Sequence, residues 1–479
     1  MKLVIPMPTS TVFDPLIHSG ATSSRLRPRA EPKLHGIFPR DDLIWKCCAI
    51  ALCVARLGGP ARADTPYAAP RPNEFIRTRL SLRYYSFDKE YGSPAEKNQS
   101  SAAAAAILHI RSTPFLDGWS LGLSLYEAWA TRRHPSPNNA LEPTLMGDGP
   151  RIATAGEAFV QYEHAGARLR IGRQVVTTPW LGPSDSRMLP QTFGGVVGRY
   201  SPVRGLKLTV LRTYSYKSRT SSGFYAENLY YRSERQGVAL PGFTGVFPRG
   251  ITLPKAPGTV AAGAAYSNGR ADIHLWFYRY FDFADTVYVV GGYAFRKPGA
   301  SWRPFVRLQF MRQSGRGFIS RYEASLFGNG GAVNSSLLGL ETGSKLYGTS
   351  LSISMDTLEH SPGAFGGGAL ISPYGAYQAM FAAHYSANLL KYGPGRVAQI
   401  TASTRFLDRH LRLEVAALAF RTIFSGQSRT LYFDGIYRFG SWLKGLQMRE
   451  RVAWDDGAKI NRGHSLVYTR LMLQYQISR

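Results

Sequence analysis

Acidic residues and long apolar runs are scarce in this chain of 479 residues. It has 31 Asp and Glu against 58 Lys and Arg, which gives a formal charge of +27. The longest apolar run is nine residues, Cys47 to Ala55, whereas a membrane-spanning helix needs roughly 20. A helical membrane protein is therefore excluded. Apolar residues still make up 44% of the chain, which is too many for a disordered protein.

The chain has only three cysteines, Cys47, Cys48 and Cys53, and all lie in its first 63 residues. This region predicts a secretory signal, because Lys46 precedes the apolar run and Ala61-Arg62-Ala63 fits an A-x-A cleavage site. The alternative is an amphipathic surface segment. We expect residues 1–63, an N-terminal extension and signal peptide, to be removed. The remaining 64–479 has no cysteine, which excludes disulfides, thiolate metal sites and a cysteine nucleophile.

The basic excess belongs to the part that remains. The first 63 residues hold 9 Lys and Arg and 4 Asp and Glu, so residues 64–479 keep 49 against 27, a charge of +22. Such a charge also suggests a nucleic-acid binder. However, the basic residues are spread along the chain rather than gathered in one stripe or tail, and a secretory signal removes the protein from the cytoplasm. We therefore expect no nucleic-acid partner.

Segments with a two-residue period recur between turns rich in Gly, Pro, Asn and Asp. From Ile76 to Tyr85, apolar residues alternate with Arg77, Arg79 and Arg83, and similar alternation is found at 168–171, 303–310 and 467–477. This period predicts extended strands with two different faces. Many segments reach ten or more residues, and a transmembrane β-strand needs about 9–11. Aromatic clusters near their ends are typical of membrane interfaces.

Strands in lipid must pair all their backbone groups, so their sheet has to close on itself. The sequence therefore predicts an all-β fold, a transmembrane antiparallel β-barrel in the bacterial outer membrane. Dividing 416 residues by roughly 22–24 for each strand and connection gives about 18 strands. We expect one barrel domain over 64–479. Four segments rich in Gly, Pro, Ser or Asn are expected to be long outward loops: 133–150, 177–195, 218–257 and 356–370.

The alternating arginines must face either hydrocarbon or water. On the lipid face each costs about 2–4 kcal/mol at the bilayer midplane, whereas in a wet lumen they cost little and create a positive field. Such rows favour anions, and arginine pairs bidentately with carboxylates. For any single arginine, the alternative is that its side chain lies in solvent or at the membrane interface. We expect a lumen-facing basic row made of ten residues: Arg77, Arg79, Arg83, Arg168, Arg170, Arg303, Arg307, Arg449, Arg451 and Arg470.

Two nearby segments of the sequence carry a recognisable motif. The stretch LRIGRQ, Leu169 to Gln174, is followed by DSRMLPQTFGG, Asp185 to Gly195. The pair resembles the OprD-type outer-membrane porins, whose third loop carries a D-S-R-L-L-P-Q-T-F-x-G segment and folds into the barrel. Looser similarities lie at Arg83-Tyr84-Tyr85, 204–208, 443–449 and 470–475. The chain ends in Arg479, whereas many outer-membrane barrels end in an aromatic residue.

The resemblance implies an 18-stranded monomeric barrel through which small carboxylate-bearing solutes diffuse along basic side chains. Such solutes are amino acids, short peptides or aromatic acids. The partners are then small anionic solutes and outer-membrane lipids, with no cofactor and no metal. The alternative for the third loop is that its polar side chains only satisfy its own backbone. Five residues of that loop are expected at the constriction: Asp185, Ser186, Arg187, Gln191 and Thr192.

Two other functions fit the same barrel, an outer-membrane enzyme and a sugar-selective porin. An enzyme would need a Ser/His/Asp or carboxylate set at one rim, and the sequence assembles none. The stretch Gly182 to Ser186 lacks the final glycine of a nucleophile elbow. The ten histidines are scattered, so we expect neither an enzyme nor a zinc site.

Overall fold

The computed structural model describes residues 75–132, 139–147, 149–183, 186–225, 258–295, 301–317, 331–374 and 379–478. The chain divides into two units, 1–46 and 47–479, and the second contains all the described residues. The expected signal peptide at 1–63 lies outside these residues. None of the helices that the structure describes is long and apolar enough to cross a membrane.

The described chain is almost entirely β-strand. Apart from α3 (Leu389–Tyr392) and the short 3-10 turns at Phe365–Gly367, Leu407–Arg409, Ser441–Leu443 and Lys459–Asn461, its elements are strands. Their bounds are β1 (Ile76–Tyr91), β2 (Gln99–Ser112), β3 (Trp119–Arg132), β4 (Ala140–Leu141), β5 (Arg151–His164), β6 (Ala167–Gln174), β7 (Thr192–Tyr200), β8 (Leu206–Lys217), β9 (Thr259–Ser267), β10 (Ala271–Tyr280), β11 (Ala284–Ala294), β12 (Trp302–Gly315), β13 (Asn334–Leu346), β14 (Thr349–Leu358), β15 (Gly395–Phe406), β16 (Leu411–Thr422), β17 (Gly426–Arg438), β18 (Leu446–Asp456) and β19 (Leu466–Ser478).

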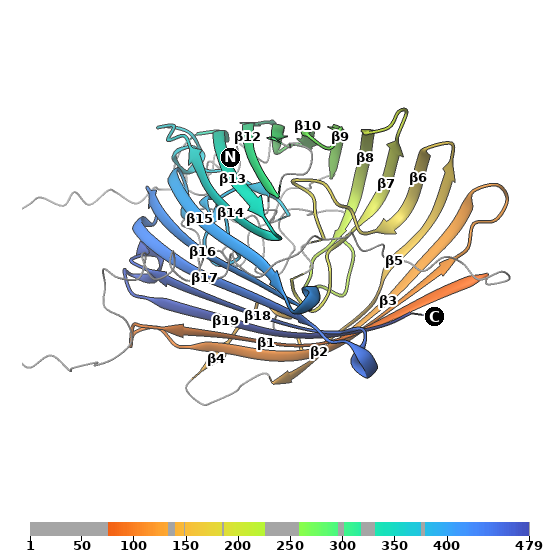
Figure 1. The fold of residues 1–479 in the computed structure, drawn as a ribbon, viewed down its shortest axis with the longest axis horizontal. Helices are drawn as coiled ribbons and strands as arrows, with labels where there is room; N and C mark the ends of the chain where they lie inside the picture. The colour runs from red at the N-terminus through yellow and green to blue at the C-terminus, as the bar shows by residue number, and fades with distance from the viewer. Residues whose placement is uncertain are drawn as a thin grey trace, which may run out of the picture. The chain divides into compact units, whose positions relative to one another are not determined.

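These strands form one closed sheet. Each long strand pairs antiparallel with the next along the chain, and β1 pairs with β19, which closes the ring. The two-residue β4 stands apart, because it pairs in parallel with β2 while β3 pairs directly with β5. Without β4 the 19-stranded sheet is an 18-stranded antiparallel barrel, as the sequence predicts. Figure 1 looks into this barrel, with β1, β2 and β19 below and β9, β10 and β12 above.

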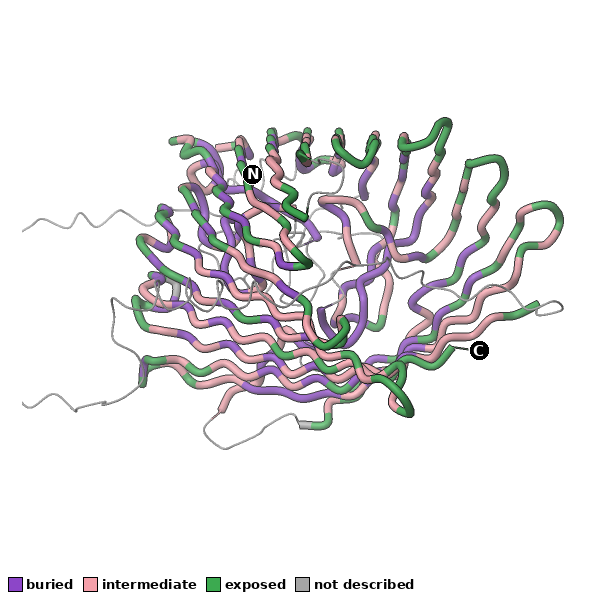
Figure 2. The backbone as a smooth tube through the Cα atoms, viewed as in Figure 1, coloured by how far each residue is buried: buried purple, intermediate pink, exposed green. Residues whose placement is uncertain are grey.

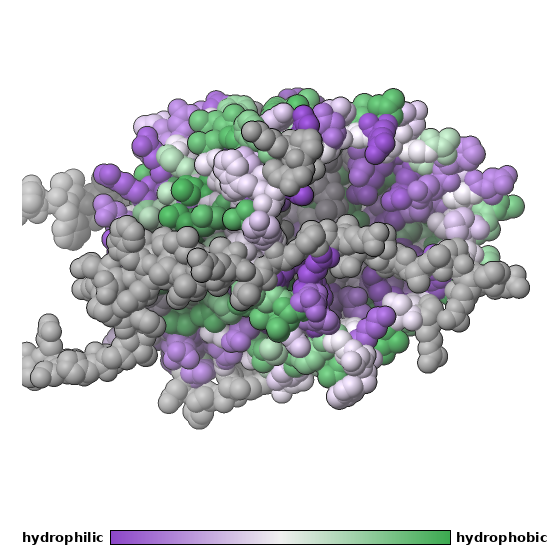
Figure 3. Space-filling model, viewed as in Figure 1, coloured by the Kyte–Doolittle hydropathy of each residue, from purple (hydrophilic) through white to green (hydrophobic). Residues whose placement is uncertain are grey.

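The two faces of the wall differ as the two-residue period requires. On β1, Leu82 and Tyr84 are 41% and 42% exposed, whereas Arg83 and Tyr85 are 8% and 2% exposed. Figure 2 shows this alternation along many strands. Exposed side chains such as Leu308, Leu338 and Ile353 lie on the outer face, where a bilayer would cover them. In Figure 3, hydrophilic residues gather in a hollow at the right of the view, over β6 to β8.

The two ends of the barrel also differ. At one end, β5 and β6 are joined by Ala165-Gly166 and β13 and β14 by Tyr347-Gly348, and the described N-terminal and C-terminal residues lie there. The long connections, such as 133–150, 175–191 and 359–394, lie at the other end, although β10 and β11, and β16 and β17, are joined there by three residues each. Short periplasmic turns and long extracellular loops are the pattern of outer-membrane barrels, so we refer to these as the short-turn and long-loop ends.

Three of the long connections fold into the barrel instead of projecting outward. Parts of the second connection (139–147, between β3 and β5), of the third connection (175–191, between β6 and β7) and of the connection after β14 (359–394) are packed against inward-facing wall residues in two buried apolar clusters. Ala103 and Ala105 of β2 leave room there for Met188 and Leu189 of the third connection. The prediction of outward loops is therefore wrong for the described parts of 133–150 and 356–370, and also for those of 177–195, for which the resemblance to OprD-type porins implies an inward fold instead. Their apolar side chains can leave water only against the inner wall.

Gly172 of β6 is expected to be required for the barrel. Its φ is +125°, which L-residues rarely adopt, and a Cβ atom would lie 2.3 Å from the Ala158 carbonyl oxygen. Gly172→Ala should destabilise the wall by about 1–3 kcal/mol and lower the fraction of protein that stays folded in detergent on heating. Gly291→Ala is the control, because its Cβ atom would meet nothing closer than 3.9 Å. Equal melting of the two variants would contradict the prediction.

Candidate functional site

The third connection is held inside the barrel by bonds to its backbone. Arg83 Nη1 donates to the carbonyl oxygens of Arg187 (3.3 Å) and Met188 (3.1 Å). Gln191 Nε2 donates to the carbonyl oxygens of Gly182 and, at 3.2 Å, Tyr374. Tyr216 donates to Gln191 Oε1 at 2.9 Å. These side chains satisfy buried carbonyls that would otherwise cost about 1–3 kcal/mol each.

The predicted constriction residues are mostly engaged within the protein. Arg187 Nε donates to the Thr144 carbonyl oxygen at 2.8 Å, and its Nη1 donates to the Ser186 carbonyl and hydroxyl oxygens. Burial and the neighbouring Arg470 lower the pKa of Arg187 to about 9. Gln191 and Thr192 are 2% and 0% exposed. Asp185 lies outside the described residues. The described part of the third connection therefore packs and bonds like a fixed partition.

A buried ion pair ties the second connection to the wall beside this partition. Lys89 Nζ lies 2.7 Å from Glu142 Oε1, and Glu142 also accepts from the backbone and hydroxyl of Thr144 and from Tyr468 OH at 3.2 Å. Burial alone would raise the pKa of Glu142, but the Lys89 ammonium and the Arg187 guanidinium lower it from 4.5 to about 2. The carboxylate is therefore ionised in the folded protein down to acid pH.

Glu142→Gln is expected to destabilise the barrel by on the order of 3 kcal/mol at pH 7, because it leaves the Lys89 charge buried without a counter-ion. Since the folded pKa is lower than the unfolded one, the contribution is complete above pH 4.5 and is lost as the pH falls to about 2. Thermal unfolding of both proteins in detergent measures this difference at each pH. The control is Glu96→Gln, which breaks the exposed pair with Arg462 and should cost less than about 1 kcal/mol. If the difference in stability between Glu142→Gln and the parent protein does not vary with pH, the lowered pKa of Glu142 is contradicted.

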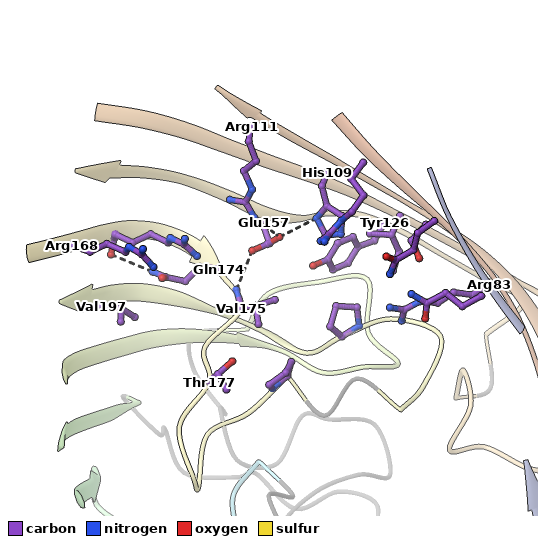
Figure 4. Close-up of a pocket in the computed structure, with 18 of the residues that line it drawn as sticks. Arg83, His109, Arg111, Tyr126, Glu157, Arg168, Gln174, Val175, Thr177 and Val197 are labelled. Atoms are coloured by element: carbon purple, nitrogen blue, oxygen red, sulfur yellow. Dashed lines mark hydrogen bonds and ion pairs between the residues drawn. The ribbon is translucent and has the colours of Figure 1, made fainter. Parts of the chain in front are cut away.

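Between the third connection and the short-turn end lies a cavity of about 670 Å³. Seven wall strands, β1, β2, β3, β5, β6, β7 and β19, contribute to its lining, and Val175, Thr177, Pro183 and Pro190 contribute from the third connection. Figure 4 shows Glu157 near Arg111 and His109, with Arg83 at one side of the cavity and Arg168 at the other. Among the described residues that line it, one is acidic, Glu157, and six are arginines: Arg79, Arg83, Arg111, Arg168, Arg170 and Arg199.

Glu157 brings a serine and a histidine together, but not as a catalytic set. Its Oε2 accepts from Ser124 Oγ at 2.6 Å and lies 3.4 Å from His109 Nδ1, which is also 2.8 Å from Ser124 Oγ. A serine nucleophile needs one imidazole nitrogen to take its proton while the other bonds the carboxylate. Here a single nitrogen contacts both groups, and the hydroxyl donates to the carboxylate. The arrangement instead fixes the wall under the third connection, whose Val175 N–H donates to Glu157 Oε1 at 3.3 Å.

Arginines lie directly opposite one another on neighbouring strands of the inner wall. Like charges in such positions repel and destabilise a sheet. Nearby acids offset some of them: Arg168 bonds Glu163 at 2.8 Å, and Arg111 bonds Glu157 at 3.1 Å. The inward-facing pairs of the described strands are Arg77 and Arg111, Arg168 and Arg199, Arg405 and Arg412, and Arg451 and Arg470.

Arg470 is enclosed by aromatic rings beside the third connection, and it shares the Phe87 ring with Arg187. It is 1% exposed, and its guanidinium carbon lies 3.7 Å from the ring centroid of Tyr385, 4.3 Å from Tyr468 and 4.6 Å from Phe87. Its Nε and Nη1 atoms have no hydrogen-bond partner among the described residues. Cation–π contacts of this kind stabilise a desolvated cation by about 2 kcal/mol. Tyr385 comes from the connection after β14 and bonds the Tyr468 carbonyl oxygen at 2.6 Å.

The other arginines predicted on the inner wall are also found on inward positions, though not in one cluster. Arg79, Arg83, Arg168 and Arg170 line the cavity, and Arg77 shares their face of β1. Arg307 bonds Glu341 at 2.8 Å, and Arg449 bonds Asp434. Arg451 lies 3.6 Å from Asp434. Arg303 has the same parity as Arg307 on β12 but is exposed near the short-turn end.

Sequence reasoning missed several residues of the site. Arg111 and His109 alternate with Leu108 and Ile110, so the same two-residue signal could have found them. Arg199 ends a glycine-rich stretch, and Glu157 lies beside a bulge that shifts the pairing of β3 and β5, so neither stands out in the sequence. No group of three or more His, Cys, Asp or Glu suited to a metal ion occurs among the described residues.

A family model described as "outer membrane porin, OprD family" matches residues 152–246. This segment includes the third connection and most of the cavity's β5 to β7 wall. The resemblance that the sequence block suggests is therefore confirmed. A search of curated proteins finds no match to the sequence.

Solved structures of OprD-type porins share the fold. The outer membrane protein OpdK from Pseudomonas aeruginosa is 18% identical, with a TM-score of 0.66 over 84% of this chain and 99% of its own. OccK9 (OpdG) from the same organism is 19% identical, with a TM-score of 0.67 over 84% and 98%. A BenF-like porin from Pseudomonas fluorescens Pf-5 is 15% identical, with a TM-score of 0.67 over 84% and 99%. At these identities the likeness concerns the fold.

Proposed function

We propose that this chain is an OprD-type outer-membrane porin, a channel and not an enzyme, and that it passes small carboxylate-bearing solutes. The solutes diffuse passively through the barrel along its inward-facing arginines. The barrel acts as a monomer over residues 64–479, after removal of residues 1–63. The third connection narrows the path, so a solute passes between it and the arginine-lined wall.

The observation that carries the proposal is the set of arginines facing one another across neighbouring strands. Such pairs do not stabilise the sheet, because the two positive charges repel each other. In a channel they become useful, because a low-dielectric wall focuses their field and raises the local concentration of anions. Each guanidinium also offers two parallel donors to a carboxylate. Substrate contact by Ser186, Gln191 or Thr192 is less supported, because the described bonds and burial of these side chains serve the partition itself.

A structural relative supports the substrate class. OpdK from Pseudomonas aeruginosa has been solved with vanillate, which is an aromatic carboxylate. It is 17% identical to this chain, with a TM-score of 0.67. A sugar-selective porin is the competing proposal, and the arginine-rich cavity favours anions over neutral sugars.

The test is ion selectivity and block of the purified full-length protein in planar bilayers. In a KCl gradient, the reversal potential should show preference for chloride over potassium, and benzoate should reduce the single-channel current. A neutral monosaccharide at equal concentration should have little effect. Cation preference, or block by the sugar and not by benzoate, would reject the carboxylate proposal.

A further inference from the structure

We infer that the cavity under the third connection selects solutes that carry two carboxylates over those that carry one. This inference rests on the proposed function and narrows its substrate class. The described lining contains six arginines and one glutamate. A solute with a single negative charge would leave most of this positive field unbalanced, whereas a second carboxylate adds a second favourable interaction.

The six arginines form two groups on separate parts of the wall. Arg79, Arg83 and Arg111 come from β1 and β2, whereas Arg168, Arg170 and Arg199 come from β6 and β7. Strands β3 and β5 lie between the groups. A solute in this cavity therefore has cationic groups on two sides, as Figure 4 shows for Arg83 and Arg168.

The two groups approach each other over one aromatic ring. The guanidinium carbon of Arg111 lies 4.2 Å from the ring centroid of Phe159, and that of Arg170 lies 4.0 Å from the same point. The two cations are thus no farther apart than the sum of these distances. Contact with the ring restrains both guanidinium groups before a solute arrives.

Glu157 makes no described bond to the second group. Its carboxylate is occupied by Arg111, Ser124 and the Val175 N–H. Arg170 instead donates Nε and Nη2 to the neutral side chain of Gln161, at 2.9 and 2.6 Å. Arg199 faces Arg168 directly across β6 and β7. Arg168 bonds Glu163 at 2.8 Å, so the β6–β7 group keeps two arginines, Arg170 and Arg199, that bond no acid among the described residues.

A dicarboxylate meets both groups at once. One carboxylate pairs with the β6–β7 arginines, and the other reaches the β1–β2 arginines. Once the first end is bound, the second binds as an intramolecular step with a high effective concentration. A monocarboxylate has no second end, and a compact dianion such as phosphate cannot divide its charge between the groups.

The experiment compares succinate with its monomethyl ester, which keeps the carbon chain and removes one charge. Both are added at pH 7.5 to single channels of the full-length protein, and the dissociation constant for current block is measured. We expect succinate to block about tenfold more tightly than the ester. Arg170→Gln and Arg199→Gln should each weaken the succinate block more than the ester block. Arg312→Gln is the matched control, because Arg312 lies on the exposed outer face of β12.

The outcomes separate this inference from the proposed function. If succinate and its ester block equally well, the dicarboxylate inference is wrong and the carboxylate porin stands. If neither blocks and the channel prefers cations, the proposed function itself fails. Inorganic phosphate that blocks as tightly as succinate would overturn the need for two separated carboxylates. Should Arg170→Gln fail to fold, Arg199→Gln provides the same comparison, since its side chain has no described bond to lose.

Discussion

Tyr385→Ala is expected to raise the single-channel conductance several-fold. The Tyr385 ring covers Arg470 at 3.7 Å and Arg451 at 5.6 Å, and its hydroxyl ties the connection after β14 to the Tyr468 carbonyl oxygen. Removing it opens space inside the barrel and uncovers two cations, and both changes favour anion flow. Conductance in symmetric KCl, measured on single channels in planar bilayers, gives the effect directly.

Tyr385→Phe is the matched control. It loses the bond to the Tyr468 carbonyl oxygen but keeps the ring over Arg470, so its conductance should stay close to that of the parent protein. If Tyr385→Ala conducts no more than Tyr385→Phe, the ring does not limit the path. The current would then be limited at the third connection.

Arg83→Ala is expected to release the third connection. The change removes the donor to two buried carbonyl oxygens, those of Arg187 and Met188. Each unsatisfied carbonyl costs about 1–3 kcal/mol, so the segment should leave its position for part of the time. We expect frequent current transitions between levels, together with weaker anion preference. Long single-channel recordings and the reversal potential in a salt gradient measure the two effects.

Arg77→Ala is the control for Arg83→Ala, because it removes a positive charge without removing bonds to the third connection. Arg77 lies on the same strand and face as Arg83, and none of its described contacts reaches the third connection. It should weaken anion preference without added current transitions. Equally quiet recordings from both variants would show that the third connection does not depend on Arg83.

The third connection is bonded to both of the other connections that fold into the barrel. Arg187 of the third connection donates to the Thr144 carbonyl oxygen of the second connection. Gln191 bonds the one after β14 through the Tyr374 carbonyl oxygen. The third connection thus bonds both others, so a substitution in any of them can alter the path through its neighbours.

The barrel itself follows from the sequence. The two-residue period on Ile76 to Tyr85 sets one apolar and one polar face, and lipid forces strands of this length to close. The arginine positions follow from the same parity, because an arginine that alternates with leucine must share the polar face. These are local properties, and each strand carries them without reference to any other.

The connections could not be predicted in this way. Segments 133–150 and 356–370 look like surface loops, since they are rich in Gly, Pro, Ser or Asn. Their direction depends on whether the wall offers space, and Ala103 and Ala105 provide it beside the third connection. That space exists only after distant strands have met.

The sequence by itself determined a closed, arginine-bearing barrel, because alternation and the exclusion of unpaired backbone from lipid act on each strand alone. Only the tertiary structure decided which arginines face each other, since a pair such as Arg451 and Arg470 depends on the register between two strands. It also decided that Glu157 is bonded to Arg111 and not to Arg170. Contacts of this kind depend on distances between strands, and no periodicity along the chain encodes them.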